Sequence, residues 1–258
     1  MVDGVGLPVA ETVGDDLLLL FASNTRPTAR QLRDSCEHSG LADLAGPDLV
    51  EHETAVDIAP PTGISLLSSG LMFDVVGLAP GPAAPIPEMG EAPEMRGAIL
   101  PSRTDAISLR LGPHIAAGKR NLAILREWFA LAQKIGDTFG AIGLCWVPGL
   151  VSLEPDDLAR QLSAWDLRGE VPVSLLASFR RTLDGALQSH GLSYLTGQEL
   201  RIEPQLMRGG EDALSRLLFT HLFYAGPLDQ TAQLAAPDGH TLRLEPSANG
   251  RYVRVWPG

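Results

Sequence analysis

The strongest amphipathic pattern in this chain covers residues 119–137. Its large apolar side chains fall on one half of a helical wheel, and most of its charged side chains fall on the other half. An apolar arc of roughly 180° is wide for a surface helix, so the pattern predicts a helix that lies against a sheet. The nearly all-apolar segment 141–147 follows and predicts a strand at the centre of that sheet.

The segments before this helix predict a second helix and several strands. Residues 17–22 are apolar throughout, as in a strand that is buried on both faces. Capping oxygens in 23–25 precede a predicted helix over 30–38, which is expected to stop at Gly40. Further strands are predicted at 54–58, 64–67, 71–76 and 106–111, with a hairpin turn at Ser69-Gly70.

The second half of the chain predicts two more helices and two strands before its final hairpins. One helix begins at Asp156-Asp157, whose carboxylates suit the positive end of a helix dipole. The other helix covers 211–225 and has its apolar side chains in register. Strands are predicted over 171–179 and over 193–202, the second of them interrupted at Gly197.

Three short strand segments separated by turn sequences lie near the C-terminus. They are 231–234, 241–245 and 251–256. The turns contain Pro237-Asp238-Gly239 and Asn249-Gly250, which tolerate the positive φ angles that tight turns need. We therefore expect an antiparallel meander in which Val253 and Val255 point into the core.

The mixture of hairpins and helices indicates an α+β fold. We expect a largely antiparallel mixed sheet, or sheets, packed against helices, with two similar α+β halves of which the second ends in the three-stranded meander. A length of 258 residues suits a single domain over 15–258, which divides into sub-halves 15–153 and 154–258. Residues 1–14 are expected to form a flexible tail.

Composition narrows the class of partner. The net charge is -11 at pH 7, and no cluster of Lys and Arg offsets it, which argues against nucleic acid and anionic membranes as main partners. A neutral or basic protein is easier to bind. Cys36 and Cys145 are too far apart to indicate a disulfide framework and are typical of buried thiols in a reducing compartment. We therefore expect a cytoplasmic protein.

Residues 80–95 predict an exposed loop. This stretch contains five prolines and three glutamates, which exclude both a helix and a central strand. Loops of this length are often functional or mobile. Glu88, Glu91 and Glu94 are therefore candidate partner-binding residues.

The sequence contains no motif that specifies a cofactor or a catalytic site. It has no P-loop, no complete dinucleotide fingerprint, no HExxH, no nucleophile elbow and no cysteine pair with metal spacing. We therefore expect no cofactor and no stoichiometric metal. His114, just before the long helix, is a candidate binding or catalytic residue, although most such loop histidines are simply solvated. Trp146 is expected in the core, but on an open sheet face it would anchor an interface.

Several segments, taken in order along the chain, resemble the bacterial domain-of-unknown-function family four-two-six-one. They are LLLLFAS, FDVVGLAPGPAAPIPEMGEAPEM, AISLRLG, AIGLCWVPGLVSLE, VPVSLLASFR and HGLSYLTGQELRIEP. The chain departs from this pattern at Leu176, where an aromatic residue is usual. The resemblance brings no catalytic residue with it, and it implies a bacterial cytoplasmic protein connected with secreted toxins and their neutralisers.

These observations favour a non-enzymatic protein-interaction module, such as a neutraliser or adaptor of a bacterial toxin or secretion system. Its partner-binding residues would be Glu88, Glu91, Glu94, Trp146 and His114. The alternative is a hydrolase with a dispersed site, in which His114 works with carboxylates from other segments. The first interpretation is preferred because the chain is acidic, carries the long Pro/Glu loop and lacks a cofactor motif.

Overall fold

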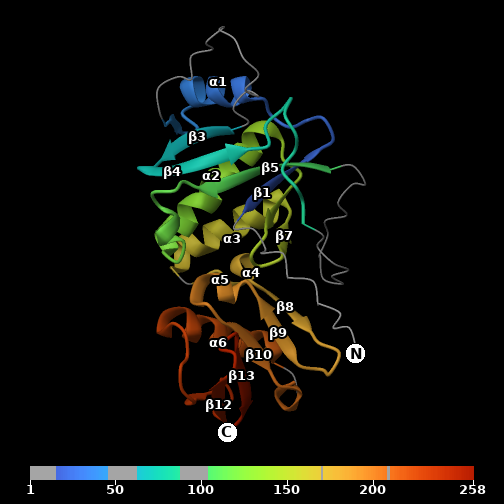
Figure 1. The fold of residues 1–258 in the computed structure, drawn as a ribbon, viewed down its shortest axis with the longest axis vertical. Coiled ribbons are helices and arrows are strands. Elements are labelled where there is room, and N and C mark those ends of the chain that lie inside the picture. Colours follow the sequence, from blue (N-terminus) through green and yellow to red (C-terminus); the bar gives the residue numbers. More distant parts are fainter. Residues whose placement is uncertain (1–15, 46–62, 88–103, 170, 208–209) are drawn as a thin grey trace, which may run out of the picture.

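A computed structural model describes residues 16–45, 63–87, 104–169, 171–207 and 210–258. Within these ranges the chain forms six α-helices and thirteen strands. The strands make two largely antiparallel sheets with helices packed against them, so the predicted α+β class is confirmed. The two sheets follow one another along the longest axis of the molecule (Figure 1).

Some predictions concern residues outside these ranges. They are the flexible tail over 1–14, the strand over 54–58 and the acidic side chains Glu88, Glu91 and Glu94. In the described part, no helix combines the length and the apolar character needed to cross a bilayer.

The first sheet has seven strands in the order β2-β3-β4-β5-β1-β6-β7, and each neighbouring pair is antiparallel. The strands are β1 (Leu17–Ala22), β2 (Asp43–Leu44), β3 (Gly63–Ser68), β4 (Leu71–Val76), β5 (Thr104–Leu111), β6 (Gly143–Trp146) and β7 (Val151–Leu153). The predicted hairpin is present as β3 and β4. The strand predicted at 141–147 is also present, but it is not central, because β7 folds back on β6 and forms the edge.

The apolar run of β1 supplies side chains to both faces of this sheet. Its odd-numbered residues pack in the main core with α2 (Leu122–Phe139). Its even-numbered residues point to the other face, where they form a smaller cluster with Ala84 and Cys145. Successive residues of a strand alternate between the faces, so both faces are apolar only if the whole run is apolar.

The segment 77–87 covers this second face of the first sheet. Ala84 is buried and donates its backbone N–H to the carbonyl of Ala106 at 2.8 Å. The guanidinium of Arg26 donates to the carbonyl oxygens of Gly77 and Gly81 and holds the segment in place. The predicted loop is therefore confirmed for residues 80–87 in its lack of helix and strand and in its exposed prolines Pro80, Pro82 and Pro85. It differs from the prediction at Ala84, which is buried because the even-numbered side chains of β1 need an apolar cover.

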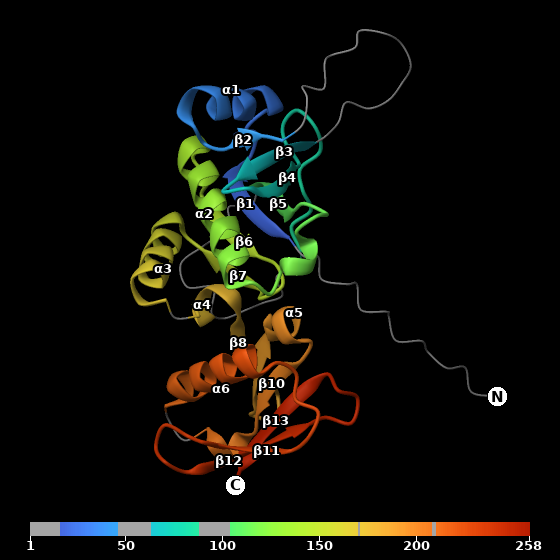
Figure 2. The same ribbon diagram turned by 90° about the vertical axis from the view of Figure 1, so that its left-hand side faces the viewer.

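The helices begin and end largely where the sequence predicts. Asn121 caps α2 by accepting the N–H of Ala123 at 2.9 Å, and Gly140 ends the helix with a φ of 71°. α3 (Pro155–Arg168) packs beside α2, and α1 (Ala29–Ser39) lies near β2 (Figure 2). The cap of α1 is Thr28 rather than a residue in 23–25, because Thr28 and Gln31 exchange hydrogen bonds in a capping box.

The second sheet has six strands in the order β11-β12-β13-β10-β9-β8. They are β8 (Ser178–Arg181), β9 (Leu187–His190), β10 (Glu199–Ile202), β11 (Ala232–Ala235), β12 (Thr241–Pro246) and β13 (Tyr252–Pro257). The predicted meander is confirmed as β11 to β13, and Val253 and Val255 are fully buried. β13 also pairs in parallel with β10, so it is an interior strand. α6 (Glu211–Ala225) supplies Leu218 and Phe219 to the same core.

Two of the predicted strands are wrong in part. Residues 171–179 form the short helix α4 (Val173–Leu176) before the chain enters β8, and residues 193–196 belong to α5 (Leu192–Thr196). Both helices are short and apolar, and periodicity cannot separate a buried strand from a buried helical turn at this length. β9 was not predicted from the sequence, because Leu187 is its one large aliphatic residue.

Trp146 lies where the two sheets meet. It is fully buried at the end of β6 and donates its indole N–H to the carbonyl oxygen of Leu176 in α4 at 3.0 Å. Its ring packs edge-on against Trp128 from α2 and Tyr194 from α5, with centroids 5.4 and 5.1 Å apart. One continuous hydrophobic core therefore contains residues from both sheets.

Trp146→Phe will lower the free energy of unfolding by about 1–3 kcal/mol, because the buried carbonyl of Leu176 loses its donor. Urea unfolding followed by circular dichroism measures the loss. Trp165→Phe is the matched control, since Trp165 is also buried but makes no indole hydrogen bond within the described residues. Equal losses for the two variants would mean that the hydrogen bond contributes nothing.

Candidate functional site

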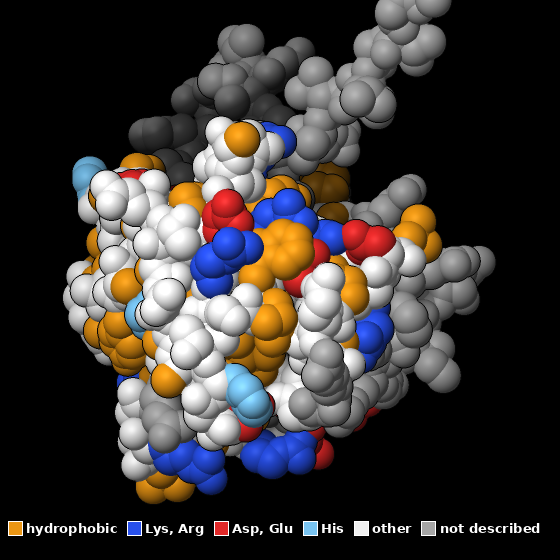
Figure 3. All heavy atoms as spheres, turned by 90° about the horizontal axis from the view of Figure 1, so that it is seen from below, with side chains coloured by type: hydrophobic (Ala, Val, Ile, Leu, Met, Phe, Trp, Pro, Cys, Tyr) orange, Lys and Arg blue, Asp and Glu red, His pale blue; other side chains and the backbone are white. Residues whose placement is uncertain are grey.

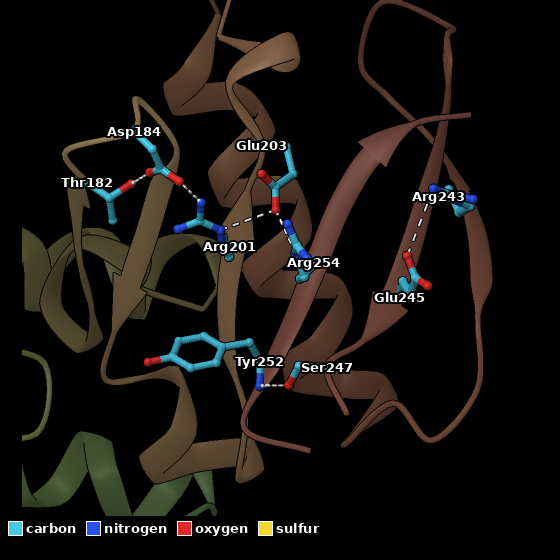
Figure 4. A network of polar contacts seen from close by, with 9 residues as sticks. All are labelled: Thr182, Asp184, Arg201, Glu203, Arg243, Glu245, Ser247, Tyr252 and Arg254. Carbon is cyan, nitrogen blue, oxygen red and sulfur yellow. Dashed lines mark hydrogen bonds and ion pairs between the residues drawn. The ribbon is translucent and has the colours of Figure 1, made fainter. Parts of the chain in front are cut away.

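The two faces of the second sheet differ in chemistry. Leu200, Ile202, Val253 and Val255 point toward α6 and are buried. The residues that alternate with them point to the opposite face, which we call the open face. It includes Arg180, Gln188, Glu199, Arg201, Glu203, Arg243, Glu245, Tyr252, Arg254 and Trp256, most of which are drawn in Figure 4. Arginine and aromatic side chains therefore gather on one side of a rigid sheet.

Strand register aligns these side chains in a row across the sheet. Arg180 on β8 lies opposite Gln188 on β9, which lies opposite Arg201 on β10. Arg201 in turn pairs with Arg254 on β13, and Arg254 lies opposite Glu245 on β12. Side chains directly opposite one another are close enough to interact. Two arginines side by side repel one another, and an anion between them removes that repulsion.

Glu203 supplies that anion. Its side chain is only 5% exposed, and its Oε1 accepts hydrogen bonds from Nε of Arg254 at 2.8 Å and Nε of Arg201 at 3.2 Å. Burying a carboxylate is unfavourable unless it is paired and hydrogen-bonded. Glu203 therefore fixes the two guanidinium groups in place at the surface of the sheet (Figure 4).

Arg201 is held from a second direction by the β8–β9 turn. Its guanidinium donates to the carboxylate of Asp184, and Asp184 also accepts the hydroxyl of Thr182 at 2.5 Å. The hydrogen bond from Thr182, followed by that from Arg201, lowers the pKa of Asp184. Burial would lower the pKa of Arg201, but Asp184 and Glu203 together raise it. The pair therefore stays ionised at neutral pH.

Trp256 is the large apolar group of the open face. The guanidinium carbon of Arg254 lies 4.5 Å from the centroid of its ring, which is a cation–π contact. Trp256 is half-buried, and its indole N–H is shielded from solvent without a hydrogen-bond partner in the described part of the chain. Arg243 lies opposite Trp256 and pairs with Glu245 at 3.9 Å.

Arg180 lies at the β8 side of the open face. Arg180 is half-buried and makes no hydrogen bond or ion pair within the described residues. Burial lowers the pKa of the neighbouring His190, Glu199 opposes that shift and the charge of Arg180 adds to it. Arg180 and Glu199 are therefore the charged groups that act on His190 at this end of the face.

The charged side chains of the open face nearly balance one another. The face and its β8–β9 turn hold the arginines Arg180, Arg201, Arg243 and Arg254 and the carboxylates Asp184, Glu199, Glu203 and Glu245, so their charges balance on a chain whose net charge is -11. Figure 3 shows this end of the molecule from below, with basic and acidic side chains around exposed hydrophobic ones. Within the described residues, His, Cys, Asp and Glu side chains form no group of three that could hold a metal.

Of the predicted site residues, the structure describes His114 and Trp146, and these two do not share a surface. His114 is exposed in the turn that follows β5. Trp146 is fully buried, so its interpretation as an exposed interface anchor is wrong, because β6 directs it into the junction of the two sheets. Glu88, Glu91 and Glu94 lie outside the described residues.

Sequence reasoning missed the open face, although part of the signal is present. Arg201 and Glu203 alternate with Leu200 and Ile202, and Arg254 and Trp256 alternate with Val253 and Val255. This two-residue period marks each segment as a strand with one polar face. It does not reveal that β10 and β13, about fifty residues apart in the chain, are parallel neighbours.

Neither a family model, nor a curated protein, nor a solved structure matches the chain. The resemblance to the domain-of-unknown-function family four-two-six-one therefore stays a prediction.

Proposed function

We propose that the protein is a non-enzymatic protein-interaction module whose open face receives the partner. The observation that carries this proposal is the fixed pair Arg201 and Arg254, held by the buried carboxylate of Glu203 beside Trp256. Arginine and tryptophan dominate the binding energy of many interfaces. Side chains that are already ordered lose less entropy when a partner binds.

Charge supports the choice of this face. The whole chain is acidic, but the open face is nearly balanced, so a protein partner meets little electrostatic repulsion there. A basic partner is attracted by the negative field of the rest of the chain, and a neutral partner is not repelled by it. Cys36 and Cys145 are free and buried, which supports action in a reducing compartment such as the cytoplasm. A toxin or a component of a secretion system as partner rests on the family resemblance.

Trp256→Ala will weaken partner binding by about 30-fold, the effect expected when a central aromatic anchor is truncated. The partner is first recovered by affinity capture from the native host and then purified, and its affinity is measured by calorimetric titration. Arg243→Ala tests the charged part of the face, since its pair with Glu245 is exposed and weak.

Matched controls lie on α6, against the opposite face of the sheet. Tyr224→Ala removes an exposed aromatic residue and Arg216→Ala removes an exposed arginine, and both should leave the affinity unchanged. Unchanged melting temperatures show that all four variants are folded. If Trp256→Ala and Arg243→Ala bind the partner like the wild type, the open face is not the binding surface.

A further inference from the structure

Strand β11 forms one edge of the second sheet. In the described structure it pairs with β12 alone, from Ala232 opposite Leu244 to Ala235 opposite Thr241. The N–H of Ala236 donates to the carbonyl of His240 at 2.8 Å, which sets the alternation of the antiparallel ladder. Even-numbered residues of β11 therefore bond to β12. The N–H and C=O groups of Gln233 and Ala235 point outward along the edge.

This edge differs from the other three sheet edges. Proteins discourage edge-to-edge pairing with very short strands, charged side chains or proline. β2 has two residues and contains Asp43, β7 has three residues, and β8 carries Arg180 and Arg181. Residues 231–236 read TAQLAA, with no charge and no proline. β11 is therefore a sheet edge open to pairing.

We propose that two copies of this chain associate by antiparallel pairing of β11 with β11, about a two-fold axis at Leu234. In this register Gln233 lies opposite Ala235 of the second copy, and Ala235 lies opposite its Gln233. The outward groups of both strands then form two complete hydrogen-bonded pairs. The ladder ends at Pro237, which lies opposite Thr231 and has no N–H to donate.

The side chains support a second copy as the occupant. Leu234 meets its own counterpart across the axis, and Ala232 and Leu234 are partly buried against the core on the α6 side. The apolar layer therefore continues from one copy into the other. The edge itself carries no charge, so the axis passes through a neutral segment of a chain whose net charge is -11. Because the contact is short, we expect weak association, with monomers at low protein concentration and dimers at high concentration.

Sedimentation velocity over a concentration series tests the proposal. We expect a reversible monomer–dimer equilibrium for the wild type. The double variant Gln233→Lys with Ala235→Lys changes two exposed side chains, leaves the β12 ladder intact and sets lysines opposite lysines, so it should be monomeric. Gln233→Glu with Ala235→Glu should also be monomeric. An equimolar mixture of the two should form a heterodimer, because each lysine then lies opposite a glutamate.

The matched control is Thr138→Lys with Ser163→Lys, which adds the same charge at exposed helix positions beside the first sheet and should dimerise like the wild type. The proposal is overturned by a wild type that is monomeric at every concentration, or by lysine variants that still dimerise. It is also overturned by a lysine–glutamate mixture that stays monomeric. A monomeric wild type whose edge binds only a different protein likewise excludes the second copy as occupant.

Discussion

A chain that ends at Ala248 will accumulate as insoluble protein. The deletion removes β13, an interior strand of the second sheet that pairs with β12 on one side and β10 on the other. Both neighbours lose a ladder of backbone hydrogen bonds, and the sheet is cut in two. Val253 and Val255 are lost as well, and each buried side chain of this size contributes about 1.5–3 kcal/mol. The total approaches the net stability of a typical domain, about 5–15 kcal/mol.

The measurement is the soluble fraction after expression, followed by the melting temperature of whatever remains in solution. The control is a chain that ends at Pro257, which keeps all of β13 and loses only the hydrogen bond from the N–H of Gly258 to Thr241. It should be soluble. A soluble protein that ends at Ala248 and melts at the wild-type temperature would show that β13 is not an integral strand.

Gly191→Ala will destabilise the protein by about 3–5 kcal/mol, since it combines steric overlap with an unfavourable backbone conformation. Gly191 lies between β9 and α5 with a φ of 106°. A Cβ atom there would lie 2.5 Å from the carbonyl oxygen of Leu176 and 2.6 Å from Cα of Gly149. Both are backbone atoms from the junction between the sheets, so neither can move aside as a flexible side chain would.

The control isolates the contact from the backbone conformation. Gly197 has a similar φ of 89°, but a Cβ atom there would meet nothing within 4 Å. Gly197→Ala should therefore cost only the left-handed conformation, about 1–2 kcal/mol. Urea denaturation of both variants gives the two free energies of unfolding. Equal losses would show that the close approach of Gly149, Leu176 and Gly191 does not limit the packing of the two sheets.

The sequence alone predicts the elements whose pattern is long or strongly periodic. β1 is an unbroken apolar run, and α2 and α6 repeat their apolar residues once per turn. The C-terminal meander is marked by turn sequences that tolerate positive φ, and Gly239 and Gly250 adopt such angles. Each of these signals is local, so it is readable without knowing what the segment packs against.

The tertiary structure decided the features that depend on distant partners. Residues 173–176 and 192–196 are helical rather than extended, because short apolar segments take the conformation that fills the junction between the sheets. Trp146 is buried for the same reason, and its hydrogen-bond partner Leu176 lies thirty residues away. The candidate site also could not be predicted from the sequence. Glu203, Arg201 and Arg254 form one network only because β10 and β13 pair in parallel, and pairings between segments far apart leave no periodic trace in the chain.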